Sequence, residues 1–170
     1  MPKKCAALAR NCVIELQQLL QRLHAADVDF VIVGGFAATL HGSTLLTRDL
    51  DVCAMLDAVA VEKLRAQLAD LHPTHRQTSQ RLSFITHPEP GLGVQNLYLE
   101  TDLGAIDLLG SIIGVGDFAR VRMAAIEVEL FGQRCPVIAV EDLIASKEAL
   151  GRDKDRLAVA ELRAILARRR

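Results

Sequence analysis

The sequence predicts an α+β fold, in which a mixed β-sheet is flanked by helices and followed by a C-terminal pair of helices. The order of the segments favours this class, and the length and composition indicate that such a domain can fold as one unit. The segments run helix, two strands, helix, several strands and two helices, without regular strand–helix alternation. The chain has 170 residues, which suits one domain. Hydrophobic residues make up 51% of it, so a core can form without disulfides or a structural metal.

The first third of the chain is expected to form two helices and two strands. Leucines recur at helical spacing within 3–26, which predicts an amphipathic helix. Residues 28–33 are mostly β-branched or aromatic, and they predict a buried strand that stops at Gly34. A short helix over 36–41 and a second strand over 49–55 are expected to follow.

The middle of the chain is expected to be rich in strands. Asp57 is the predicted N-cap of a helix over 58–71, because its carboxylate can accept a hydrogen bond from a free amide there. Glycine and proline then separate five further predicted strands, which lie at 81–86, 95–100, 105–109, 127–131 and 134–138. The last two strands flank Gly132 and Gln133, and this pattern predicts a hairpin.

The end of the chain is predicted to form the helical pair. A helix over 141–150 is expected to end at Gly151, and Asp153 is expected to cap a last helix that reaches about residue 166. No linker or internal repeat interrupts the sequence. We therefore expect one domain over 1–170, made of an N-terminal helix (1–27), a sheet core (28–139) and C-terminal helices (140–170).

Composition excludes several classes of protein. Lys and Arg number 20 against 21 Asp and Glu, so the net charge of −1 disfavours binding to long nucleic acids. Aromatic residues are only 4%, which disfavours a base-stacking platform. No C-x-x-C pair, signal peptide or membrane-spanning run is recognisable. A cytoplasmic protein that does not contact membranes is the expectation.

Three aspartates carry the strongest chemical signal. Asp49 and Asp51 are two apart on a predicted strand, so they share one face about 6.6 Å apart. Asp107 lies within another apolar strand, where a lone charge is costly without a partner. Carboxylates held together repel unless a cation lies between them, and Mg²⁺ prefers such ligands. The same D-x-D spacing recurs at 27–29 and 153–155, where turns and helix starts explain it.

A glycine pair supplies a complementary feature. Gly34 and Gly35 follow a buried strand and precede a short helix, so their backbone amides can face an anion. Amides on one side and metal-bound carboxylates on the other would suit a bound triphosphate.

These motifs together resemble the active-site signature of the DNA polymerase beta superfamily of nucleotidyltransferases. The small bacterial members, such as the minimal nucleotidyltransferases and AbiEii-type toxins, are the most similar. The matching segments are Val33–Ala37, His41–Ser43, Thr47–Val52, Glu141–Ile144 with Lys147, and Gly151–Asp155.

The resemblance implies transfer of a nucleoside monophosphate from an NTP, such as ATP, to an acceptor hydroxyl. Two Mg²⁺ ions, or Mn²⁺, would be the cofactors. It implies three metal-binding catalytic residues, namely Asp49, Asp51 and Asp107. It also implies five nucleotide-binding residues, namely Gly34, Gly35, Thr47, Arg48 and Lys147. The acceptor could be a protein side chain, a tRNA end or a small molecule. Further partners could be a second copy of the chain or a cognate toxin or antitoxin.

Each candidate also has a purely structural interpretation. The Asp49 and Asp51 pair could be a solvated strand end, and Asp107 could close a turn or pair with a Lys or Arg. Lys147 could serve the dipole of its helix, and His41 could be a core hydrogen-bonding group.

The function has an alternative as well. Leu45 stands where many nucleotidyltransferases of this superfamily have Arg, which removes a possible phosphate contact. The alternative is therefore a non-catalytic domain of the same fold, which senses nucleotides or binds another protein.

Overall fold

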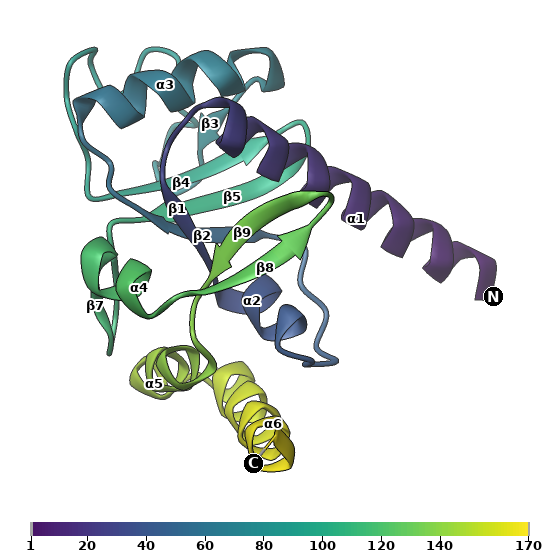
Figure 1. Cartoon of the computed structure of the whole chain (residues 1–170). Coiled ribbons are helices and arrows are strands. Elements are labelled where there is room, and N and C mark those ends of the chain that lie inside the picture. Colours follow the sequence, from purple (N-terminus) through teal and green to yellow (C-terminus); the bar gives the residue numbers. More distant parts are fainter. Residues whose placement is uncertain (1, 170) are drawn as a thin grey trace. The chain divides into compact units, whose positions relative to one another are not determined.

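The computed structural model describes the backbone of residues 2–169 and the side chains of residue 13 and residues 15–169. Seven strands form one mixed sheet in the order β3-β4-β5-β2-β1-β9-β8, and β6 and β7 form a separate pair. The strands are accompanied by helices, as Figure 1 shows, so the predicted α+β class is confirmed.

The chain divides into two compact units. The first comprises the chain up to Val28, Arg48–Leu50 and Leu56–Asp107, and the second comprises Asp29–Thr47, Asp51–Met55 and the chain from Leu108 onward. That residues 1–170 act as one domain stays a prediction.

The first unit combines helices with three strands. Its elements are α1 (Pro2–Ala25), α3 (Ala58–Leu68), the 3₁₀ turn η1 (Ala69–Leu71), β3 (Thr74–His75), β4 (Asn96–Thr101) and most of β5 (Gly104–Leu109). Helix α1 packs against α3, and β3 pairs antiparallel with β4. Asp57 caps α3 as predicted, since its Oδ1 accepts a 2.8 Å hydrogen bond from the Ala60 amide. The leucine stripe of α1 is buried from Leu16 to Leu23 and forms part of the core.

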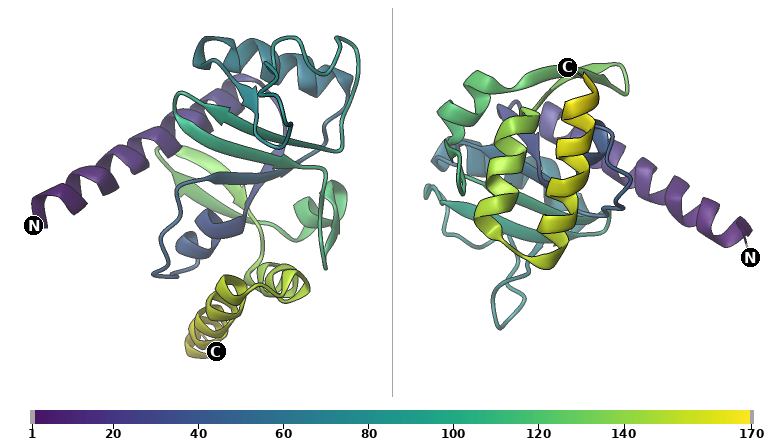
Figure 2. Two further views of the ribbon diagram at one scale, coloured as in Figure 1. Left: turned by 180° about the vertical axis from the view of Figure 1, so that it is seen from behind. Right: turned by 90° about the horizontal axis from the view of Figure 1, so that it is seen from below.

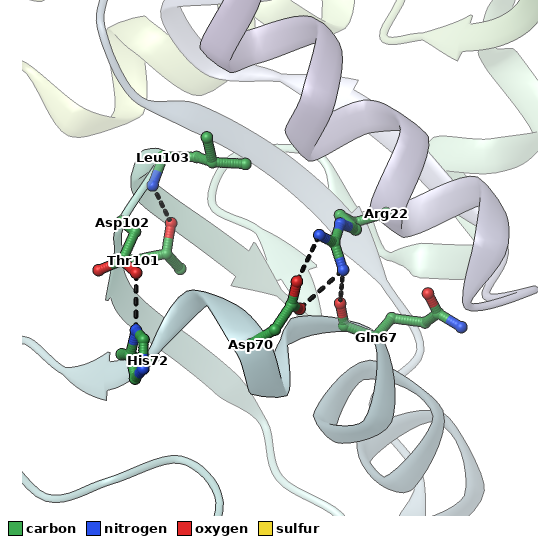
Figure 3. Close-up of polar contacts among 7 residues, drawn as sticks. All are labelled: Arg22, Gln67, Asp70, His72, Thr101, Asp102 and Leu103. Carbon is green, nitrogen blue, oxygen red and sulfur yellow. Dashed lines mark hydrogen bonds and ion pairs between the residues drawn. The ribbon is translucent and has the colours of Figure 1, made fainter.

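Polar contacts close the end of this unit (Figure 3). The Arg22 guanidinium donates hydrogen bonds of 2.7 Å to both carboxylate oxygens of Asp70, and a further one to the Gln67 carbonyl. This bidentate ion pair joins α1 to η1, and the hydrogen bond to Gln67 joins α1 to the end of α3. Nearby, His72 Nδ1 lies 2.7 Å from Asp102 Oδ2, which ties the turn after η1 to the β4–β5 turn.

The second unit contains the remaining strands and helices. Its strands are β1 (Phe30–Val33), most of β2 (Leu50–Ala54), β6 (Ser111–Ile112), β7 (Gly116–Asp117), β8 (Ile126–Leu130) and β9 (Gln133–Val137). Its helices are α2 (Gly34–Leu40), α4 (Phe118–Ala124), α5 (Val140–Leu150) and α6 (Asp153–Arg169). Strand β1 is buried throughout, pairs antiparallel with β2 and is parallel to β9. Helices α5 and α6 lie side by side, as predicted for the C-terminal pair (Figure 2).

Several local predictions were wrong. Residues 81–86 form no strand: Ser83 makes one isolated bridge to Thr74, and Phe84 is buried within a turn. The hairpin turn is at Phe131 and Gly132, one residue earlier than expected, because these two residues adopt the positive φ angles (52° and 77°) that suit such a turn.

Of the predicted boundaries of the last two helices, one is correct and one is wrong. Gly151 ends α5 in the left-handed region (φ 65°), as predicted. Asp153 is the first residue of α6 and not its cap. No helix within residues 2–169 combines the length and apolar character that crossing a membrane requires.

The His72–Asp102 pair makes stability depend on pH. The hydrogen bond and charge of Asp102 raise the pKa of His72, against a small opposing effect of burial. A raised pKa means that the stabilisation is fully present below about pH 6.5 and is lost as pH rises through the folded value. We expect His72→Asn, which tolerates the left-handed backbone, to lower the free energy of unfolding more at pH 5.5 than at pH 8.5 in urea titrations. An Asp102→Asn background should remove most of this difference and leave only the smaller effect of Asp70, and equal losses at both pH values in the wild-type background would contradict the prediction.

Candidate active site

The turn between β1 and α2 is shaped around an aspartate. Gly34 has φ of +64°, and a Cβ atom placed on it would lie 2.0 Å from Asp51 Oδ2 and 2.7 Å from Asp51 Cβ. Strand pairing explains the contact, because Val33 is opposite Asp51 in the β1–β2 register. Only glycine leaves room for this carboxylate, and only glycine adopts that φ angle without strain. The structure thus brings Gly34 and Asp51 together.

The second glycine has a similar neighbour. A Cβ atom on Gly35 would lie 2.8 Å from Thr47 Oγ1. Thr47 is therefore packed against the turn, immediately before the segment that carries the aspartates. Gly35 and Thr47 are both candidate nucleotide-binding residues, and the structure places them side by side.

A carboxylate from the last helix holds the loop that leads to Thr47. Glu161 on α6 accepts hydrogen bonds from Ser43 Oγ (2.7 Å), the Thr44 amide (2.8 Å) and Thr44 Oγ1 (2.7 Å). These hydrogen bonds lower the pKa of Glu161. Arg169, near the end of the same helix, donates a 2.8 Å hydrogen bond to the His41 carbonyl. The loop over 41–44 is thus attached to α6 at both of its ends.

Lys147 belongs to a charged group at the junction of α5 and α6. Its side chain is only 12% exposed, and its Nζ lies 3.8 Å from Asp155 Oδ1. Arg152 Nε donates a 2.5 Å hydrogen bond to the other oxygen of Asp155. Burial lowers the pKa of Lys147, and Arg152 adds to this, whereas Asp155 and Asp51 work against it. Asp51 therefore acts electrostatically on the lysine that is the candidate phosphate ligand.

The other two aspartates form a group in the first unit. Asp107 on β5 is 18% exposed and forms an ion pair with Arg76, which follows β3. Burial raises the pKa of Asp107, Asp49 and Glu100 raise it further, and Arg76 opposes the rise. Asp49 is thus close enough to Asp107 to repel it. Arg48, beside Asp49, is exposed.

The structure therefore describes the candidate residues in two groups. Gly34, Gly35, Thr47, Asp51 and Lys147 belong to the second unit. Asp49 and Asp107, with Arg48, belong to the first, and the tripeptide at 49–51 connects the two groups covalently.

The donor chemistry of the aspartates suits a hard divalent cation. Asp49, Asp51 and Asp107 offer carboxylate oxygens, the ligand type that Mg²⁺ prefers. Within the described part of the chain, however, no three His, Cys, Asp or Glu side chains are gathered so that they could hold a metal as they stand. Asp107 is engaged by Arg76 instead. The residues fit Mg²⁺ chemically, although one carboxylate oxygen of Asp107 is already paired with Arg76.

Other residues have structural explanations. His41 is buried, and its Nε2 lies 2.7 Å from the Ile138 carbonyl, which is the core hydrogen-bonding role. Cys53 is fully buried, and burial raises its thiol pKa to about 12, so it behaves as a core residue. The sequence did not point to Arg76 or Glu161. Their partners are 31 and about 118 residues away, and no local periodicity signals such pairs.

Known proteins were compared with the chain in sequence and in structure. No protein-family model and no curated protein matches the sequence. Solved structures do match. The lincosamide antibiotic adenylyltransferase LnuA, in a structure with lincomycin bound, is 18% identical with a TM-score of 0.59, and the match covers 89% of this chain and 96% of LnuA. The chain has a nucleotidyltransferase fold. The resemblance inferred from the sequence is confirmed at this level.

Two further structures share the nucleotidyltransferase fold. A Thermotoga maritima protein assigned as a nucleotidyltransferase is 16% identical with a TM-score of 0.51, and the match covers 100% of this chain and 96% of that one. The antibiotic-resistance factor ANT(2'')-Ia, studied in solution, is 14% identical with a TM-score of 0.50, and the coverage is 91% and 92%.

The Gly34 contact gives a direct structural test. We expect Gly34→Ala to lower the free energy of unfolding by about 2–4 kcal/mol, because it combines a strained φ angle with a clash that must move Asp51. Gly132→Ala is the matched control, since Gly132 has φ of +77° and open space around its Cβ position. That variant should lose only about 1–2 kcal/mol in urea denaturation. Equal losses would show that the Asp51 contact contributes nothing.

The Glu161 contacts predict local protection of the 41–44 loop. Glu161→Ala removes all three acceptor interactions, so the Thr44 amide should exchange its hydrogen faster in hydrogen–deuterium exchange. Glu148→Ala is the control, because it removes an exposed ion pair with Arg163 on the same helix pair and leaves the loop contacts intact. Unchanged exchange at Thr44 in the Glu161 variant would contradict the assignment.

Proposed function

We propose that the chain is an enzyme that transfers a nucleoside monophosphate from an NTP to an acceptor hydroxyl. The acceptor oxygen forms a bond to the α-phosphorus, the bond to the β-phosphate oxygen breaks, and pyrophosphate leaves. One observation carries the proposal. In a chain with the nucleotidyltransferase fold, Asp51 and Thr47 lie against the two glycines of the β1–α2 turn. The turn at Gly34 and Gly35 is thus packed directly against Thr47 and Asp51.

Each group has a proposed role. Gly34 and Gly35 bring backbone amides close to the triphosphate, and Lys147 contributes a positive charge to it. Asp49, Asp51 and Asp107 would hold Mg²⁺ or Mn²⁺, and the resemblance implies that Asp107 would serve the acceptor side. Bound metal ions supply charge neutralisation at the phosphates and activation of the attacking oxygen. Thr47 and Arg48 position the start of the aspartate strand.

The acceptor is the open part of the proposal. Antibiotics with free hydroxyl groups are the first acceptors to test, because LnuA is a lincosamide adenylyltransferase and ANT(2'')-Ia an antibiotic-resistance factor. A tRNA end and a protein side chain, as in a toxin–antitoxin or defence system, stay predictions. ATP as the preferred NTP, a cytoplasmic location and a homo-oligomeric or toxin–antitoxin partner stay predictions as well.

A second candidate function has its own support. Leu45 replaces a possible phosphate-binding Arg, and Arg76 engages the carboxylate of Asp107. Both features suit a non-catalytic domain that senses nucleotides or binds a protein. Calorimetry with ATP, GTP, CTP and UTP in Mg²⁺ tests for the nucleotide site: heat with one NTP supports an enzyme or a nucleotide sensor, which pyrophosphate release then separates, and no heat with any NTP favours a protein-binding module.

Substitution of the aspartates tests the enzyme. We expect Asp49→Asn and Asp51→Asn each to reduce NTP-dependent pyrophosphate release below about one hundredth of the wild-type rate, because each removes a metal-binding charge. Thermal unfolding should stay close to wild type. Asp29→Asn is the matched control, since Asp29 belongs to another D-x-D pair, is exposed and forms an ion pair with Arg122. Full activity in both aspartate variants would refute the proposal.

A further inference from the structure

Arg76 is held where it can neutralise a half-buried carboxylate. Its backbone amide donates a 2.8 Å hydrogen bond to the Tyr98 carbonyl, which extends the β3–β4 pairing by one residue. Its guanidinium then reaches Asp107 on β5, and the two side chains are 29% and 18% exposed. The ion pair is thus partly shielded from water, and a charge interaction is stronger there than on an open surface.

The guanidinium is not fully satisfied in this position. Nη2 bonds one oxygen of Asp107, whereas Nε is buried and has no hydrogen-bond partner among the described residues. A structural Arg–carboxylate pair usually uses two parallel hydrogen bonds. A buried donor without a hydrogen-bond partner carries a desolvation penalty. A different position of the Arg76 side chain that satisfies Nε would therefore be more favourable for this donor.

Several carboxylates surround Arg76. Those of Asp107, Asp49 and Glu100 all act electrostatically on its guanidinium. Asp49 and Glu100 also raise the pKa of Asp107. Neighbouring carboxylates repel one another, and a hard divalent cation is the kind of ion that such oxygen ligands prefer.

We propose that Arg76 is the resident counter-ion of the metal site: it holds Asp107 while no cation is bound and releases it when the cation binds. The inference rests on the proposed function, because it takes Asp49 and Asp107 as metal-binding residues. Arg76 is therefore a positioning residue that acts through Asp107. It stabilises the acidic group when no cation is bound, and it makes cation binding compete with an internal ion pair.

Metal affinity tests the inference without any catalytic assay. Mn²⁺ binding to the full chain is measured by calorimetry in the absence of nucleotide. We expect Arg76→Gln to bind Mn²⁺ about 10-fold more tightly than wild type, because removing a positive charge next to the carboxylate removes a repulsion of the metal ion and a competitor for the same oxygen. Arg81→Gln is the matched control: it removes the same charge from an exposed position and should leave the affinity unchanged. In an Asp107→Asn background, the effect of Arg76→Gln should largely disappear.

A measurement on the wild-type chain covers the case in which Arg76→Gln does not fold. Diamagnetic Mg²⁺ is titrated into ¹⁵N-labelled protein, and the Arg76 Nε–H resonance is followed by NMR with Arg81 as reference. Release of the ion pair predicts a selective shift of Arg76 and faster exchange of its guanidinium hydrogens. No change at Arg76 under saturating Mg²⁺ would overturn the inference.

The outcomes separate this inference from the proposed function. Equal or weaker Mn²⁺ binding by Arg76→Gln overturns the counter-ion role, even if Asp49→Asn and Asp51→Asn abolish NTP turnover. If those aspartate variants keep full activity, the proposed function is overturned instead. If neither the wild type nor Arg76→Gln binds Mn²⁺, the counter-ion role is overturned together with the metal site.

Discussion

The close approach of Asp51 to Gly34 is the steric constraint around which the second unit is arranged. The pairing of β1 with β2 places Asp51 opposite Val33, and its carboxylate then fills the space that a side chain at Gly34 would need. The positive φ of Gly34 lets the chain turn from β1 directly into α2. Because Gly35 meets Thr47 in the same way, the turn and the segment leading into β2 determine each other's positions.

In each unit, a carboxylate with little solvent exposure is stabilised by nearby positive charges. Asp155 is almost fully buried, and although burial works against it, Arg152 and Lys147 lower its pKa. Asp107 is compensated less completely, because Arg76 must also face Asp49 and Glu100. Burying a carboxylate requires a nearby positive charge, and the two units meet this requirement to different degrees. The less compensated group is the one to which the resemblance assigns metal ligands.

How much of this the sequence could predict depends on whether a feature is local. The cap at Asp57, the C-terminal glycine of α5 and the paired last helices follow from residues within a few positions, and these predictions were correct. Strands β3, β6 and β7 have two residues each, which is too short for any periodicity to register, and they were missed. The segment 81–86 has the composition of a strand, but Phe84 is buried in a turn beside Arg65 instead.

The candidate site divides along the same line. The glycine pair and the D-x-D strand are local motifs, so the sequence marked them, and the structure adds the contacts that join them. The Arg76–Asp107 pair bridges 31 residues and depends on how β3 and β5 are placed around β4, which no single stretch of sequence specifies. Asp107 was considered as a partner of some Lys or Arg, but the identity of that residue required coordinates.

The attachment of the 41–44 loop to α6 has a practical consequence for handling the protein. Arg169 and Glu161 connect helix α6 to the loop that precedes Thr47. A label introduced on α6 at either residue would remove these contacts and so disturb a loop that lies 117 to 128 positions away in the sequence. Labels and immobilisation handles are better introduced on an exposed turn such as that at Gly91 in the first unit.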